Sequence, residues 1–252
     1  MNRSLLTCIF LLLLSTSAFA ETTPYERIQA AIHYWREDSS RSDATMIIHR
    51  PDWERTMRMH TWTKGLDHSL IRFVAPKKDA GTASLKIKQD MWSFTPKINR
   101  IIKIPGSMMH QSWMGSDFSY NDLARDDDLI EQYQHTYLPT ETSQENGTLY
   151  VIQSIPHDDA PVVWGKEVIK VREDNIIVEH TFFDQEMIPV KQLQTLKIAP
   201  LGGKLFPVEL MMKNLETPDE WTTIIHHSVQ FDLNLSSNLF TLSNLRNPRQ
   251  EQ

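Results

Sequence analysis

Cysteine and glycine are the residues that this sequence uses least. Its 252 residues include one cysteine, Cys8, and eight glycines. Beyond Cys8 the chain has no thiol for a disulfide, a thiolate metal site or a lipid anchor. No glycine-rich phosphate loop, G-x-S-x-G nucleophile elbow or H-E-x-x-H zinc motif occurs. Enzyme signatures are therefore scarce, and no catalytic residue, cofactor or metal site is expected. A hydrolase on a β scaffold is a weak alternative, because no triad of nucleophile, base and orienting residue can be assembled.

A basic surface is also missing, because the formal net charge is -6 and the pI is about 5.9. Nucleic acids and anionic lipid surfaces both select for positive charge, so neither is an expected partner. Hydrophobic residues make up 40% of the chain, which is ordinary for a globular protein. No repeat with a period of 20–50 residues occurs, which argues against a solenoid or propeller. We expect one domain over residues 21–252.

The N-terminus has the three parts of a secretory signal peptide. Arg3 provides the positive charge, Leu5–Leu14 the short apolar core, and Ala18–Ala20 an A-x-A cleavage site. An apolar core of about ten residues is too short for a membrane-spanning helix, which needs about 20. Residues 1–20, and Cys8 with them, are therefore predicted to be removed. The mature protein is expected in the periplasm.

The mature sequence begins with one helix and continues in short strands. Pro24–Trp35 has helical spacing of its apolar residues, with Thr23 as the N-cap. Ser39–Asp43 is predicted to be a polar turn. Alternating segments then run to Ile104 and resume from Asp128, separated by turn signals, as in antiparallel sheets. About ten or eleven strands are predicted, and a sheet of that size must curl or close.

Residues 105–125 interrupt this alternation. Their apolar residues follow no period of two, and Ser119 is suited to cap a short helix over Tyr120–Ala124. Long loops in compact domains are uncommon and are often functional lids. This segment is therefore predicted to be a lid.

Aromatic and methionine side chains gather in and just before the predicted lid. Each one alone could fill an ordinary core, but the group is suited to line and cover an apolar pocket. Copper binding by Met108, Met109, His110 and Met114 is an alternative, which we rank below packing or lipid contact. The predicted cavity and lid residues are Trp92, Phe94, Ile101, Met108, Met109, Trp113, Met114, Phe118 and Tyr120.

Other polar clusters favour ordinary structural roles. His226 and His227 are adjacent in a predicted strand, so their side chains point to opposite faces and cannot easily share a metal. His157–Asp159 lies between prolines and resembles a solvated turn. Asp126–Asp128 lacks the alternating ligands and the glycine of a calcium loop.

Two blocks of the sequence resemble a known family. Met91–Arg100 contains a W-x-F-x-P strand, and Met114–Leu123 contains G-S-D-F-x-Y-x-D-L. Their order and spacing are similar to those of the LolA-like outer membrane lipoprotein-sorting proteins of bacteria. The resemblance covers most of the mature chain. It marks as motif residues Gly115, Ser116, Asp117 and Asp122.

The resemblance implies a mainly β fold, namely a half-open antiparallel β-barrel with helices and a lid covering its concave apolar face. It implies a monomeric periplasmic carrier, without enzyme activity, that holds acyl chains of lipids or lipoproteins. An RND-type inner-membrane exporter and an outer-membrane acceptor would be its partners. An accessory subunit of such an exporter is the alternative function. Asp117 and Asp122 could anchor the lid through Arg72 or Arg100.

Overall fold

The computed structural model describes residues 22–124 and 126–248. The predicted signal peptide, residues 1–20, lies outside the described residues. Within them, fourteen strands form one antiparallel sheet, accompanied by four α-helices, which confirms the mainly β prediction. None of the helices in the described ranges is long and apolar enough to cross a membrane.

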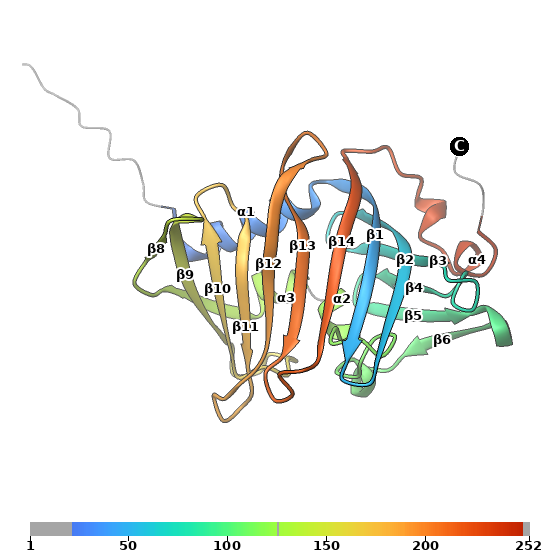
Figure 1. Ribbon diagram of the computed structural model, residues 1–252, viewed down its shortest axis with the longest axis horizontal. Helices are drawn as coiled ribbons and strands as arrows, with labels where there is room; N and C mark the ends of the chain where they lie inside the picture. The colour runs from blue at the N-terminus through green and yellow to red at the C-terminus, as the bar shows by residue number, and fades with distance from the viewer. Residues whose placement is uncertain (1–21, 125, 249–252) are drawn as a thin grey trace, which may run out of the picture.

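The elements follow one another as a helix, six strands, a helical connection and eight more strands (Figure 1). The helices are α1 (Pro24–Arg36), α2 (Tyr120–Ala124), α3 (Asp126–Glu131) and α4 (Leu242–Arg246), with single 3-10 turns at Pro96–Ile98, Gly106–Met108 and Ser237–Leu239. The strands are β1 (Ser39–Arg50), β2 (Trp53–Lys64), β3 (His68–Ala75), β4 (Ala83–Ile87), β5 (Asp90–Thr95), β6 (Arg100–Ile104), β7 (Tyr133–Tyr137), β8 (Glu141–Ser143), β9 (Gly147–Pro156), β10 (Lys166–Arg172), β11 (Ile177–Phe183), β12 (Pro189–Leu201), β13 (Lys204–Asn214) and β14 (Trp221–Phe231).

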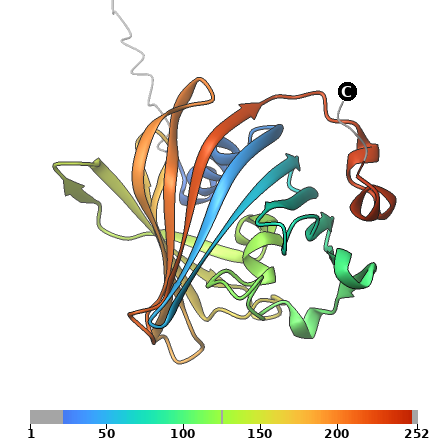
Figure 2. The ribbon, with the colours of Figure 1, turned by 45° about the vertical axis from the view of Figure 1, so that its right-hand side comes forward.

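The order of the strands explains why the helical connection must cross the sheet. It is β6-β5-β4-β3-β2-β1-β14-β13-β12-β11-β10-β9-β7, with β8 attached to β9. The strands β6 and β7 are therefore opposite edges, and in the described residues they do not pair with each other. The sheet is curled but open, which agrees with the predicted half-open barrel (Figure 2). The chain between its edges runs over one face.

The strand count exceeds the predicted ten or eleven for local reasons. A turn after Ile87 divides the segment 83–95 into β4 and β5. The short strand β8 pairs with β9 through only three residues, too few to show an alternating pattern. The predicted polar turn Ser39–Asp43 was wrong, because it forms the start of β1. There Ser40 and Thr63 of β2 are buried, and their hydroxyls share a hydrogen bond of 2.7 Å. This bond satisfies the two polar groups in the buried position.

The helix α1 begins as predicted. The Thr23 hydroxyl accepts a hydrogen bond from the Glu26 N–H, and the Glu26 carboxylate accepts one from the Thr23 N–H, which makes a capping box. Ile28 and Ile32 are buried against α3 and the strands β9 and β10. The helix therefore covers one half of the concave face.

The convex face is also partly covered, which the sequence did not predict. Leu70, Leu85 and Phe94 pack there against Phe240 and Leu245 of the C-terminal segment. Arg72, also on this face, donates hydrogen bonds to the backbone carbonyls of residues 244 and 245 at 2.9–3.3 Å. The strands β3, β4 and β5, which lie near the β6 edge of the sheet, consequently have buried side chains on both faces.

Candidate functional site: an apolar cavity under a lid

A cavity of about 320 Å³ lies between the concave face of the sheet, α1 and the lid segment, which we define as residues 105–124. This volume falls in the range of small-molecule binding sites. Its wall is largely apolar. Side chains that line it include Ile32 and Trp35 of α1, Trp113, Phe118 and Leu123 of the lid segment, Met59 and Ile71 of β2 and β3, and Leu193, Phe206, Leu210, Met212 and Ile224 of β12 to β14.

Trp113 connects the lid segment to the core. It is only 2% exposed and packs against Phe73, with ring centroids 5.4 Å apart. Its indole N–H donates a 3.0 Å hydrogen bond to the Ser84 hydroxyl, so the one polar atom of the side chain is satisfied. Trp113 therefore belongs both to the cavity wall and to the hydrophobic core.

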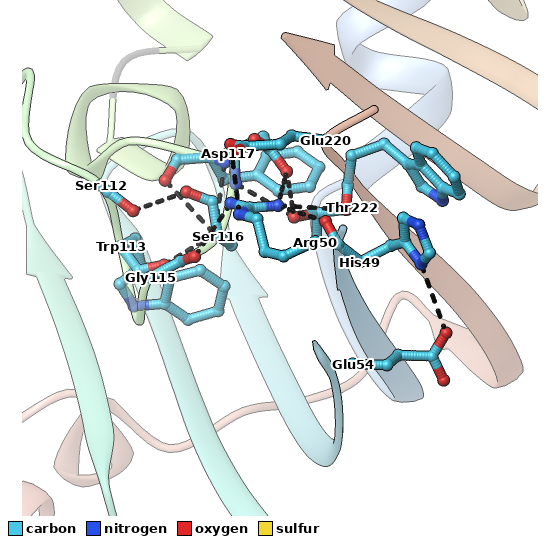
Figure 3. A network of polar contacts seen from close by, with 12 residues as sticks. His49, Arg50, Glu54, Ser112, Trp113, Gly115, Ser116, Asp117, Glu220 and Thr222 are labelled. Atoms are coloured by element: carbon cyan, nitrogen blue, oxygen red, sulfur yellow. Dashed lines mark hydrogen bonds and ion pairs between the residues drawn. The ribbon is translucent and has the colours of Figure 1, made fainter. Parts of the chain in front are cut away.

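The G-S-D-F motif forms a tight turn next to Trp113 (Figure 3). Met114 and Gly115 both have positive φ angles, 57° and 78°, a conformation that favours glycine. The Ser116 hydroxyl donates to the Trp113 carbonyl at 2.6 Å. The Trp113 N–H donates to the Phe118 carbonyl at 2.7 Å, which closes the turn. The motif thus fixes the backbone that presents Trp113 and Phe118 to the cavity.

Arg50, at the end of β1, holds this turn against the sheet. It donates to the Asp117 carboxylate at 3.0 Å and to the Gly115 carbonyl at 3.1 Å, and it pairs with Glu220 at 3.3 Å (Figure 3). The Thr222 hydroxyl also donates to Asp117, at 2.6 Å. Arg50 and Asp117 are largely buried, so the surrounding water screens their attraction little. We refer to Arg50, Gly115, Asp117 and Thr222 as the lid anchor.

Asp122 makes a second connection from the lid segment to the sheet. The Asp122 N–H donates to the Ser119 hydroxyl at 3.3 Å, as the predicted cap at the start of α2 requires. The Asp122 carboxylate accepts from the Ser119 N–H at 2.7 Å and from Lys191 of β12 at 2.5 and 2.7 Å. The Lys191 ammonium also lies 4.7–4.9 Å from the ring centroids of Phe182 and Trp164. The predicted partners Arg72 and Arg100 were wrong for both aspartates, because Arg50 and Lys191 take those positions.

The structure places only some of the sequence-predicted cavity residues at the cavity. Trp113 and Phe118 line the cavity, while Met114 and Tyr120 pack behind them against the same core. Met109 is buried in a separate cluster with Met91, and Met108 is exposed. The remaining three, Trp92, Phe94 and Ile101, lie on the convex face beside the C-terminal segment.

His226 of β14 is a cavity residue whose position was not predicted. Its ring makes edge contacts with Trp35 and Phe206, each with centroids 5.4 Å apart. Burial, with a smaller effect from the neighbouring His227, lowers the pKa of His226 to about 4. His227 points the other way and bonds Thr45, so the prediction that the two rings face opposite sides is confirmed.

We compared the chain with protein families, with curated proteins and with solved structures. A family model described as "Uncharacterized protein" matches residues 65–247. The chain belongs to this family. A search of curated proteins finds no match.

Solved structures share the fold along most of the chain. A DUF1329 family protein from Desulfovibrio piger has 24% identity and a TM-score of 0.80, covering 88% of this chain and 97% of its own. A structure described as an outer membrane lipoprotein-sorting protein domain, from Vibrio parahaemolyticus, has 22% identity and a TM-score of 0.78 at 88% and 98% coverage. A LolA superfamily protein from Nitrosomonas europaea has 18% identity and a TM-score of 0.74 at 88% and 99% coverage. The predicted LolA-like fold is confirmed.

The lowered pKa of His226 predicts an acid-sensitive fold. At pH values between about 4 and the ordinary pKa of 6.5, His226 is protonated in the unfolded chain but neutral in the folded chain. The stability contributed by the neutral ring is therefore present above pH 6.5 and lost as the pH falls toward 4, by about 3 kcal/mol. Urea unfolding of wild type and His226→Phe at pH 7 and pH 4 measures this difference. The variant should lose about 3 kcal/mol less than wild type, and an equal loss would contradict the assignment.

Proposed function

We propose that this protein is a non-enzymatic periplasmic carrier that encloses acyl chains of lipids or lipoproteins in its cavity. The apolar cavity under the lid segment is the observation that carries the proposal. The LolA-like fold supports it, since a similar fold occurs in a structure described as a lipoprotein-sorting protein domain. An RND-type inner-membrane exporter as donor and an outer-membrane acceptor are the partners that we propose.

Apolar burial supplies enough free energy for such a carrier. Transfer of one methylene from water to an apolar site yields about 0.8 kcal/mol. A chain of about fourteen carbons therefore gains roughly 10 kcal/mol before the cost of immobilising it. Direct phosphate or carboxylate recognition is not required for this affinity. The cavity wall, with Leu193, Leu210 and Ile224 on the sheet side, provides suitable contacts.

The proposed carrier must also release its ligand, and the lid anchor is the element that we assign to this step. The lid segment separates the cavity from solvent on one side, and the anchor fixes it through the backbone of Gly115 as well as the side chain of Asp117. Opening would require these contacts to break without disturbing the sheet. Lid motions of this kind commonly set the rates of binding and release.

Arg50→Lys is expected to speed release of a bound fatty acid about tenfold. Lysine keeps a positive charge opposite Asp117 but lacks the planar fork that also reaches Gly115 and Glu220. Stopped-flow transfer of a fluorescent fatty acid to acceptor vesicles gives the rate. Arg58→Lys is the matched control, because Arg58 pairs with Asp43 on an exposed surface. Equal rates in both variants would contradict a gating role for the anchor.

Titration with a fluorescent fatty acid tests the proposed function itself. The wild-type protein should increase the fluorescence of cis-parinaric acid with saturation near one molecule per chain. The increase should be displaced by palmitate but not by butyrate, because short chains bury too few methylenes. A protein that produces no saturable increase is not an acyl carrier.

A further inference from the structure

His226 in the cavity wall leaves the hydrogen-bonding capacity of its whole ring unused. Among the described residues, neither ring nitrogen of His226 has a hydrogen-bond partner, although both are almost completely inaccessible to solvent. A neutral imidazole carries one N–H donor and one acceptor nitrogen. Leaving both unpaired in an apolar surrounding is costly, so buried groups of this kind usually have partners.

A second histidine of the same cavity shows the usual arrangement. His180 of β11 also lines the wall, and its ring nitrogen lies 2.6 Å from the carboxylate of Glu167. The packing of His226 is different, since its ring makes edge contacts with Trp35 and Phe206, which stack on each other. These rings fix the orientation of His226 and offer its nitrogens no strong partner. The ring of His226 therefore provides an unpaired hydrogen-bond donor and an unpaired acceptor in a largely apolar part of the cavity wall.

We propose that His226 binds the polar group of the enclosed ligand, and that this group is an uncharged hydroxyl carried on an acyl or alkyl chain. A hydroxyl can accept a hydrogen bond from the ring N–H or donate one to the unprotonated ring nitrogen, so it pairs with either form of the nitrogen that it reaches. A carboxylate or phosphate fits less well, because a neutral imidazole does not compensate a buried negative charge. Since the pKa of His226 is lowered to about 4, the ring is neutral at physiological pH. This inference rests on the proposed carrier function and specifies its ligand class.

The comparison of an alcohol with the matching alkane tests the inference. Dodecan-1-ol and dodecane are titrated against wild type by displacement of cis-parinaric acid. His226→Phe keeps an aromatic ring beside the stacked rings of Trp35 and Phe206 but removes both nitrogens. We expect this variant to bind dodecan-1-ol about tenfold more weakly and dodecane within twofold of wild type. His226→Leu, which should give the same selective loss, replaces it if the phenylalanine variant does not fold.

Trp164→Phe provides the control at another part of the wall. The Trp164 indole N–H is also buried without a partner, but Trp164 lies beside Lys191 of β12. In the strand register Lys191 is opposite Asn214, the last residue of β13, whereas Phe206, beside His226, is near the first residue of β13. Trp164 and His226 are therefore near opposite ends of this strand. Trp164→Phe should leave the preference for the alcohol unchanged.

The outcomes separate the inference from the function on which it rests. Equal losses for alcohol and alkane in His226→Phe, or no loss for either, would overturn the role of His226. A selective loss in Trp164→Phe alone would place the hydroxyl elsewhere and also overturn it. In each of these cases wild type still binds both probes, so the carrier function stands. A wild type that binds neither probe would overturn both.

Discussion

Trp113→Asp is expected to lower the free energy of unfolding by about 4 kcal/mol or more. The variant leaves a cavity where the indole filled the core against Phe73, and it places a carboxylate in a buried position. The hydrogen bond that the indole N–H donates to the Ser84 hydroxyl is also lost. Because Trp113 belongs to the core as well as to the cavity wall, loss of ligand binding should accompany the loss of stability.

Met108→Asp is the matched control for this prediction. Met108 lies in the same lid segment but is 38% exposed, so its carboxylate variant should unfold within about 0.5 kcal/mol of wild type. Urea unfolding monitored by tryptophan fluorescence compares the three proteins. A Trp113→Asp variant as stable as wild type but unable to bind fatty acid would show that Trp113 acts only as part of a detachable lid.

Leu193→Trp is expected to weaken fatty acid binding roughly a hundredfold while the fold stays intact. Leu193 lines the cavity from β12, and a larger side chain there would fill space that the ligand needs. Displacing about four methylenes of an acyl chain forfeits about 3 kcal/mol, which corresponds to this change in affinity. The cavity can accommodate the added volume, so the usual cost of overpacking a core should be small.

Leu196→Trp makes the same substitution three residues further along the same strand. Leu196 is 43% exposed, so the added indole should affect neither binding nor stability. Titration with cis-parinaric acid beside a thermal melt compares both variants with wild type. Equal affinities in the two variants would show that the ligand does not occupy the cavity.

The sequence predicted the local elements well because the signals for them are local. Thr23 and Pro24 mark the start of α1, and Met57 and Met59 alternate with exposed residues along β2 as a half-buried strand requires. Ser119 and Asp122 together mark the start of α2. Each of these features depends on residues within a few positions of one another.

Which face of a strand borders the cavity could not be predicted, because both faces near the β6 edge are buried. Trp92 and Phe94 have the same apolar character as Ile71 and Phe73, but they pack beneath the C-terminal segment. The pairing of β1 with β14 brings residues about 180 positions apart together, which no local pattern reveals. Such pairing placed Leu193, Leu210 and Ile224 in the cavity wall without a recognisable motif.

The partners of charged lid residues illustrate the same limit. The motif identified Asp117 and Asp122 as candidate anchors, and both are anchors in the structure. Their partners, Arg50 and Lys191, lie 67 and 69 positions away in sequence. A carboxylate in a loop can pair with any cation that the fold brings near it. Only the strand order selects among the candidates.

Mass spectrometry of the organic extract of the protein tests the central claim most directly. Wild type and Leu193→Trp are purified in parallel from bacterial cells without detergent, and the extracted acyl lipids are quantified per mole of protein. The carrier account predicts acyl lipids in a near-stoichiometric amount with wild type and at least a tenfold smaller amount with Leu193→Trp. Wild type free of acyl lipid, or an equal amount in both proteins, would contradict it.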